Sequence, residues 1–133
     1  MNRKAVLSQT EVQQILTAAR TEAQANQWAV TIVVVDDGGH PLALERLDGC
    51  APGSAYIATE KARTSALGRR ESKSYEDMVN GGRYAFLSAP LLTSLEGGVP
   101  IIVDGQVIGA VGVSGVKAEQ DAQVAKAGAQ CLK

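Results

Sequence analysis

The sequence predicts an α+β fold within the wider α/β class, with one antiparallel sheet of about five strands and helices on both faces. Two hairpin signals support this prediction, because Asp36-Asp37-Gly38-Gly39 separates two strand-like runs and Asp104-Gly105 separates two more. Hairpins do not occur in a wholly parallel sheet. The run Ala29–Val35 is nearly all apolar and β-branched, which is typical of a central strand covered on both faces.

Apolar residues at helical spacing predict four helices around these strands. The helices are expected over residues 8–26, 54–67, 74–81 and 118–132. Ser8-Gln9-Thr10-Glu11 has the form of a capping box, in which the serine hydroxyl accepts from a free backbone N–H. The second helix has a stripe of alanines, so it is able to lie close against a sheet.

The strands are expected over residues 29–35, 41–48, 99–103 and 106–113, with a short fifth strand around 93–96. The Asp104-Gly105 pair supplies the positive φ angles that a tight hairpin needs. Pro100 lacks an N–H, which indicates the start of a strand or an edge strand. Residues 1–133 are expected to form a single domain, because a chain of this length fits one compact core.

Composition excludes several partner classes. Thirteen Lys and Arg residues against fourteen Asp and Glu residues give a net charge of −1, which argues against nucleic acid or an anionic membrane as the main partner. The longest apolar runs are too short to span a bilayer. Mostly polar residues follow Met1-Asn2-Arg3-Lys4, so a cytoplasmic location is expected. Cys50 and Cys131 have no CxxC spacing, which favours structural or incidental thiols.

The sequence holds one histidine, His40, at the end of the first hairpin turn. A multi-histidine metal site within one chain is therefore excluded, and no metal site is predicted. His40 is either a turn residue that bonds to a neighbouring carboxylate or an axial ligand or general base. No motif of a known nucleophile, metalloprotease, phosphate loop or dinucleotide site is present. The catalytic residues are thus unknown, and whether the protein is an enzyme stays open.

A cationic stretch from Lys61 to Lys73 carries five Lys and Arg residues, and it is either a solvated face or an anion site. Gly97-Gly98 either offers backbone N–H groups to an anion or turns a corner. Arg46 ends the second strand, at a rim where an apolar face meets water. We expect Arg46, Lys61, Gly97 and Gly98 to border one ligand pocket.

Two further features have alternative explanations. Ala110 and Gly112 leave room above the sheet, which either the alanine-rich helix or a flat ligand fills. The segment Tyr84–Leu92 concentrates the only Phe with one Tyr and three leucines. It closes over its own core or is covered by a partner subunit. The second alternative, with the apolar edge strand 99–103, predicts a homo-oligomer that is a dimer or a multiple of dimers.

The motifs DDGGH, EKART, EGGVPI and GAVGVSG, followed by Asp121, resemble the GlcG/HbpS family over nearly the whole chain. The resemblance implies a profilin-like sandwich with an antiparallel sheet and homo-oligomers up to octamers. It also implies haem binding or haem degradation, so haem is the cofactor expected by resemblance. The family's operon contexts suggest glycolate or diol metabolism.

These observations lead to one principal hypothesis and two alternatives. The first is a cytoplasmic, homo-oligomeric small-molecule-binding protein that takes haem. The second is an auxiliary enzyme or binder of a small hydroxy-acid or aldehyde. The third is a structural accessory protein whose glycines serve packing only, since a fold does not fix a function.

Overall fold

The computed structural model describes residues 1–132 and contains a four-stranded antiparallel sheet in the order β2-β1-β4-β3. Its elements are α1 (Gln9–Ala25), β1 (Thr31–Asp36), β2 (Pro41–Arg46), α2 (Gly53–Gly68), α3 (Lys73–Asn80), the 3-10 helix η1 (Tyr84–Ser88), β3 (Gly98–Val103), β4 (Gln106–Ser114) and α4 (Ala118–Ala129). The expected α+β class, the helices on both faces and the two hairpins are confirmed.

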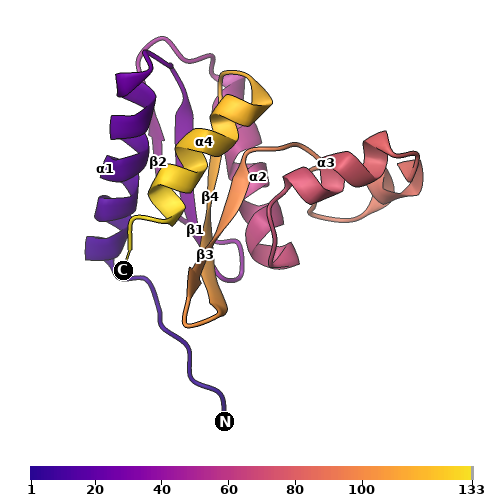
Figure 1. Ribbon diagram of the computed structural model, residues 1–133, viewed down its shortest axis with the longest axis horizontal. Coiled ribbons are helices and arrows are strands. Elements are labelled where there is room, and N and C mark those ends of the chain that lie inside the picture. Colours follow the sequence, from indigo (N-terminus) through magenta and orange to yellow (C-terminus); the bar gives the residue numbers. More distant parts are fainter. Residues whose placement is uncertain (133) are drawn as a thin grey trace.

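The sheet lies between two helical layers (Figure 1). Helices α1 and α4 lie side by side on one face, while α2 covers the other. Strands β1 and β4 are central, as the apolar run 29–35 predicts. Asp104 and Gly105 both have positive φ angles, of 51° and 74°, which match the tight β3–β4 hairpin.

The expected fifth strand around residues 93–96 is wrong. Backbone N–H and C=O groups of this segment form hydrogen bonds with side-chain hydroxyl groups and not with a neighbouring strand. Thr93 N donates to Thr64 Oγ1 at 2.7 Å, and Leu95 O accepts from Ser72 Oγ at 2.6 Å. The expected capping box is also different, because Ser8 Oγ donates to the Glu11 carboxylate and makes no cap bond to the backbone.

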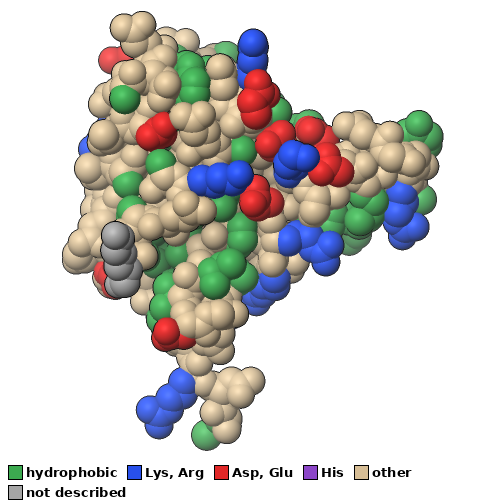
Figure 2. Space-filling model, viewed as in Figure 1, with side chains coloured by type: hydrophobic (Ala, Val, Ile, Leu, Met, Phe, Trp, Pro, Cys, Tyr) green, Lys and Arg blue, Asp and Glu red, His purple; other side chains and the backbone are tan. Residues whose placement is uncertain are grey.

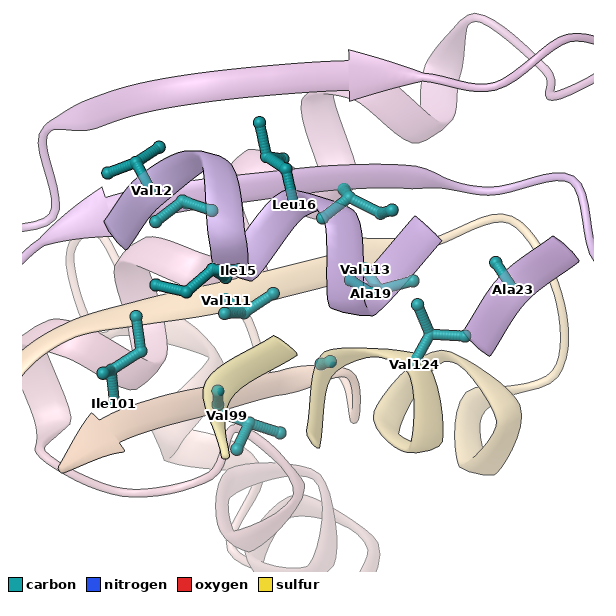
Figure 3. Packing of buried hydrophobic residues seen from close by; sticks show 14 of the residues in the cluster. Val12, Ile15, Leu16, Ala19, Ala23, Val99, Ile101, Val111, Val113 and Val124 are labelled. Atoms are coloured by element: carbon teal, nitrogen blue, oxygen red, sulfur yellow. The ribbon is translucent and has the colours of Figure 1, made fainter. Parts of the chain in front are cut away.

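The larger core lies between the sheet and the α1–α4 layer (Figure 3). Side chains of both helices and of β3 and β4 point into it, which explains the apolar stripes seen in the sequence. The fully buried members include Ile15, Ile32, Val34, Ile101, Val111, Val113 and Val124.

The opposite face is packed much more closely, because small residues line both the sheet and α2. Its buried cluster consists of Val33, Val35, Ala58, Ala62, Ala66 and Ala110. A Cβ at Gly112 would lie only 2.5 Å from Ala62 N and would also overlap the carbonyl oxygen of Ala58. The room above Ala110 and Gly112 is therefore filled by α2, which confirms the packing alternative over the flat ligand.

Strand β3 is an edge strand, as expected. Some of the backbone groups on its open side already have hydrogen-bond partners. Ser72 N donates to Gly98 O at 3.0 Å, while Gly98 N donates to Ser72 Oγ at 2.8 Å. Pro100, the next residue whose backbone faces outward, has no N–H to offer. These two features protect the edge against pairing with another strand.

Residues 73–92, here called the arm, project from the body of the molecule (Figure 1). The rings of Tyr75 and Phe86 stack within the arm, with centroids 4.8 Å apart. Other apolar side chains of the arm reach the surface, and Figure 2 shows them in green at its far end and along its lower side. Tyr84 and Leu87 are 67% and 66% exposed.

Candidate functional site

The β1–β2 turn is organised around the carboxylate of Asp36. His40 Nδ1 lies 3.0 Å from Asp36 Oδ1 and 3.2 Å from Oδ2. The same Oδ1 accepts from the backbone N–H of Gly38 at 2.9 Å and of His40 at 3.0 Å. The bond from His40 to a neighbouring carboxylate is thus confirmed, while the role of His40 as a ligand stays a prediction.

The ring of His40 is both exposed and held in place. Its side chain is 78% exposed, yet Nδ1 is engaged by Asp36. The ring also lies against Gly38, because a Cβ there would be 2.8 Å from His40 Cε1. Nε2 is consequently the ring nitrogen left for a ligand or a proton.

Three cationic side chains lie around the turn. Lys4 Nζ is 2.8 Å from Asp37 Oδ2, and this hydrogen bond lowers the pKa of Asp37. Arg69 Nη1 donates to the backbone oxygen of Asp37 at 2.5 Å. Arg63 packs on the turn, since a Cβ at Gly39 would lie 2.7 Å from its Cγ. Arg63 and Arg69 belong to the predicted cationic stretch, so part of that stretch lies beside His40.

Lys61 is the buried member of the cationic stretch. Its Nζ lies 3.0 Å from Asp121 Oδ2 and donates to Val113 O at 3.0 Å. The side chains of Lys61 and Asp121 are only 5% and 4% exposed. Burial raises the pKa of Asp121, although the Lys61 ammonium opposes this effect. The anion that faces Lys61 is therefore a carboxylate of the chain itself.

Gly97 and Gly98 lie against Lys61, so the structure brings three of the four predicted pocket residues together. A Cβ on Gly97 would lie 2.8 Å from Lys61 Nζ, and one on Gly98 would overlap the Lys61 carbonyl oxygen. Both glycines are buried. The Lys61 side chain and Asp121 thus take up the space beside the two glycines, and a ligand pocket bordered by these residues stays a prediction.

Arg46 lines a hollow whose lining does not include Lys61, Gly97 or Gly98. Together with Gln24, Trp28 and Asp48, Arg46 lines this hollow of about 430 Å³ at the end of α1. Its strand partner is Thr31, on the face of the sheet that α2 covers. Arg46 is exposed, in contrast to the buried Lys61. The grouping of Arg46 with Lys61 in one pocket stays a prediction.

Two residues of these clusters were not predicted as site residues. Asp36 directly precedes the turn, and its distance of four residues from His40 is the signal that could have identified it. In the sequence, Asp121 is singled out only as the residue that follows the four family motifs. Its partner lies 60 residues away in the sequence, so no local pattern indicates the pair.

A third group of polar side chains includes a cysteine, because Cys50 Sγ lies 2.9 Å from Ser54 Oγ, which lies 2.7 Å from Thr31 Oγ1. Cys50 and Cys131 are free thiols, and burial raises the pKa of Cys131. Within residues 1–132, no group of three or more His, Cys, Asp and Glu side chains is arranged to hold a metal ion. In the same part of the chain, no helix has both the length and the hydropathy needed to cross a bilayer.

Comparison with known proteins agrees with this architecture. The family described as "Haem degrading protein HbpS-like" matches residues 7–130. The chain belongs to the HbpS-like family. Among curated relatives, Protein GlcG of Escherichia coli (strain K12) is 66% identical over 114 residues, which are 86% of this chain and 85% of GlcG.

Two solved structures extend the likeness to three dimensions. A crystal structure of HbpS superposes with a TM-score of 0.89 at 26% identity, covering 100% of this chain and 94% of HbpS. The crystal structure of a PduOC:Heme complex superposes with a TM-score of 0.86 at 27% identity and covers 96% of each chain. The likeness in fold thus covers 96% or more of this chain, and one of these two structures is a haem complex.

Proposed function

We propose that this protein binds haem at the β1–β2 turn, with His40 as the iron ligand. The observation that carries the proposal is the exposed imidazole whose Nδ1 is engaged by Asp36. A ligating histidine usually donates its other ring N–H to a carboxylate or carbonyl, which fixes the ring and raises the basicity of the ligand. The PduOC:Heme relative supports the choice of haem over other iron compounds.

The residues around the turn fit haem in two further ways. Arg63, Arg69 and Lys4 lie beside it, and guanidinium and ammonium groups suit the carboxylates of the haem propionates. Leu42 and Leu44 follow His40 on β2, are 43% and 50% exposed, and offer aliphatic surface to the macrocycle. When bound, haem would supply an iron centre for ligand or electron chemistry, and the residues of the turn would hold it in position.

The test is titration of the purified protein with ferric haem. We expect a Soret band that shifts from the position of free haem, and we expect His40→Ala to weaken binding at least tenfold. Because the chain contains a single histidine, the variant removes imidazole ligation within the subunit completely. An identical spectrum and affinity in His40→Ala would exclude His40 as the ligand.

The proposal includes a cytoplasmic location and self-association as a dimer or a multiple of dimers. Exposed apolar side chains on the arm support self-association, because Tyr84 and Leu87 would lose contact with water in an interface. A partner subunit would also cover part of a haem bound at so exposed a histidine. Fractionation of cells that express the native gene tests the location.

The second candidate is a binder of a small carboxylate, as in the hydroxy-acid hypothesis. Its support is the same group of cations around the turn, together with the exposed Arg46. Of the predicted set Arg46, Lys61, Gly97 and Gly98, only Arg46 is accessible to a carboxylate without displacement of Asp121. A thermal-shift screen with glycolate and glyoxylate tests this candidate, since a ligand of the folded state raises Tm.

A further inference from the structure

In the β1–β2 turn, several contacts fix the ring of His40 although its side chain is exposed. Side chains on a surface usually keep their rotamer freedom, and fixing one costs conformational entropy. Here one carboxylate oxygen, Asp36 Oδ1, accepts from two backbone N–H groups and lies 3.0 Å from Nδ1 of the His40 ring. Gly38 leaves the space in which the ring lies.

The backbone of the turn adds two more restraints. Asp36 N donates to His40 O at 3.0 Å, and Gly39 N donates to Asp36 O at 3.1 Å. Gly39 has a φ of 79° and lies against Arg63, so helix α2 packs directly on the turn. The position of the Asp36 carboxylate relative to the ring is therefore set by the fold and does not depend on a chance contact between side chains.

We infer that Asp36 is a positioning residue that holds neutral His40 in the Nδ1–H form and presents the Nε2 lone pair to an incoming iron centre. A carboxylate accepts a hydrogen bond from Nδ1–H and repels a lone pair, so it selects this tautomer. The metal-binding part of the inference rests on the proposed function. The tautomer itself does not, because it is a property of the protein without haem.

Nitrogen-15 NMR of the ligand-free protein tests the inference directly, since the single histidine gives one unambiguous pair of ring signals. At a pH where His40 is neutral, we expect the Nδ1–H tautomer to dominate in the unmodified protein. We expect Asp36→Ala to shift the population strongly toward Nε2–H, and Asp36→Asn to shift it less, because the asparagine oxygen still accepts from Nδ1–H while its amide N–H groups favour the other tautomer. Asp36→Asn keeps an oxygen that accepts from the two backbone N–H groups. It therefore removes the negative charge while the hydrogen bonds that hold the turn remain.

Asp37→Asn is the matched control. Asp37 is the neighbouring acid, but its carboxylate faces Lys4 and Arg69. We expect this variant to retain the tautomer of the unmodified protein. A dominant Nε2–H tautomer in the unmodified protein would overturn the inference, as would equal tautomer shifts in Asp36→Ala and Asp37→Asn.

Haem titration of the same variants separates this inference from the proposed function. If both hold, Asp36→Asn binds haem several-fold more weakly and its spectrum changes, while Asp37→Asn retains the spectrum. If the tautomer shifts as expected but haem affinity is equal in His40→Ala and the unmodified protein, the proposed function fails and the positioning of His40 by Asp36 stands. If the tautomer does not respond to Asp36, the positioning role fails whatever the haem result.

Discussion

Lys61 and Asp121 form an ion pair at 3.0 Å between helices that lie on opposite faces of the sheet. Lys61 comes from α2 and Asp121 from α4, so the pair connects the two helical layers. Val113 O accepts from the same ammonium, and Val116 N donates to Asp121 Oδ1 at 3.1 Å. Both charges are thus satisfied inside the protein.

The first prediction concerns this pair. Asp121→Asn or Lys61→Met alone should destabilise the fold by roughly 3–5 kcal/mol, because each leaves a buried charge without its partner. The double variant should lose much less than the sum, since a buried ion pair contributes little beyond its own desolvation cost. Urea unfolding of the four proteins measures the coupling. Additive losses would contradict the prediction.

The second prediction concerns the close packing of α2 on β4. Gly112→Ala should destabilise the protein by about 1–3 kcal/mol or more, because the added methyl group overlaps the backbone of α2. Gly53→Ala is the control, since a Cβ at Gly53 meets nothing within 4 Å. Thermal unfolding of both variants checks the difference. Equal Tm values for Gly112→Ala and Gly53→Ala would disprove a packing role for Gly112.

The third prediction concerns Glu96, which lies near Glu76, Lys73 and Glu119. Burial raises the pKa of Glu96 above its usual value of 4.5, and Glu76 and Glu119 add to the rise while Lys73 opposes it. When the pKa of an acid is higher in the folded state than in the unfolded state, the folded state binds more protons at pH values near those pKa values. Stability therefore falls as pH rises through the window between the two pKa values. Glu96→Gln should raise Tm at pH 7.

The gain from Glu96→Gln should disappear near pH 3.5, where the carboxyl is protonated in both states. The control is Asp48→Asn, which removes one negative charge from an exposed position in the β2–α2 connection. A Tm gain that is the same at both pH values, or that Asp48→Asn matches, would show that burial of Glu96 is not the cause.

The fourth prediction concerns assembly. Sedimentation at micromolar concentration should give a species larger than the 13.9 kDa chain, and Leu87→Glu should dissociate it. Leu87 is preferable to Phe86 for this test, because Phe86 stacks on Tyr75 and a change there would disturb the arm itself. Val6→Glu, at an exposed apolar residue outside the arm, is the control. A single 13.9 kDa species in the unmodified protein would exclude assembly.

Most of the fold could be predicted because its signals are local. Alternation and turn chemistry located the hairpins, and the alanine stripe of α2 indicated close contact with the sheet. The segment around residues 93–96 was misassigned for the opposite reason. No local pattern shows that Thr64 and Ser72, which are 29 and 23 residues away from their partners in the sequence, bind its backbone.

The candidate site could be predicted only in part. His40 was identified because it is unique and follows a turn, and Asp36 lies close enough in sequence to fall within the same motif. Lys61, Gly97 and Gly98 lie together in the structure, with Asp121 paired to Lys61, while their role at a ligand pocket stays a prediction. Asp121 reaches Lys61 through the packing of α2 and α4 on the sheet, and no spacing in the sequence encodes that contact.

The sequence by itself determined the hairpins, the helical stripes and the small residues that set how closely α2 approaches, because each depends on neighbours a few residues apart. Only the tertiary structure decided which charges are available to a ligand. Lys61 and Arg63 are two residues apart on one helix, yet one faces a buried carboxylate and the other packs beside the exposed turn. The reason is physical: the side a helix presents to the sheet fixes which charge is desolvated and must find its partner inside the protein.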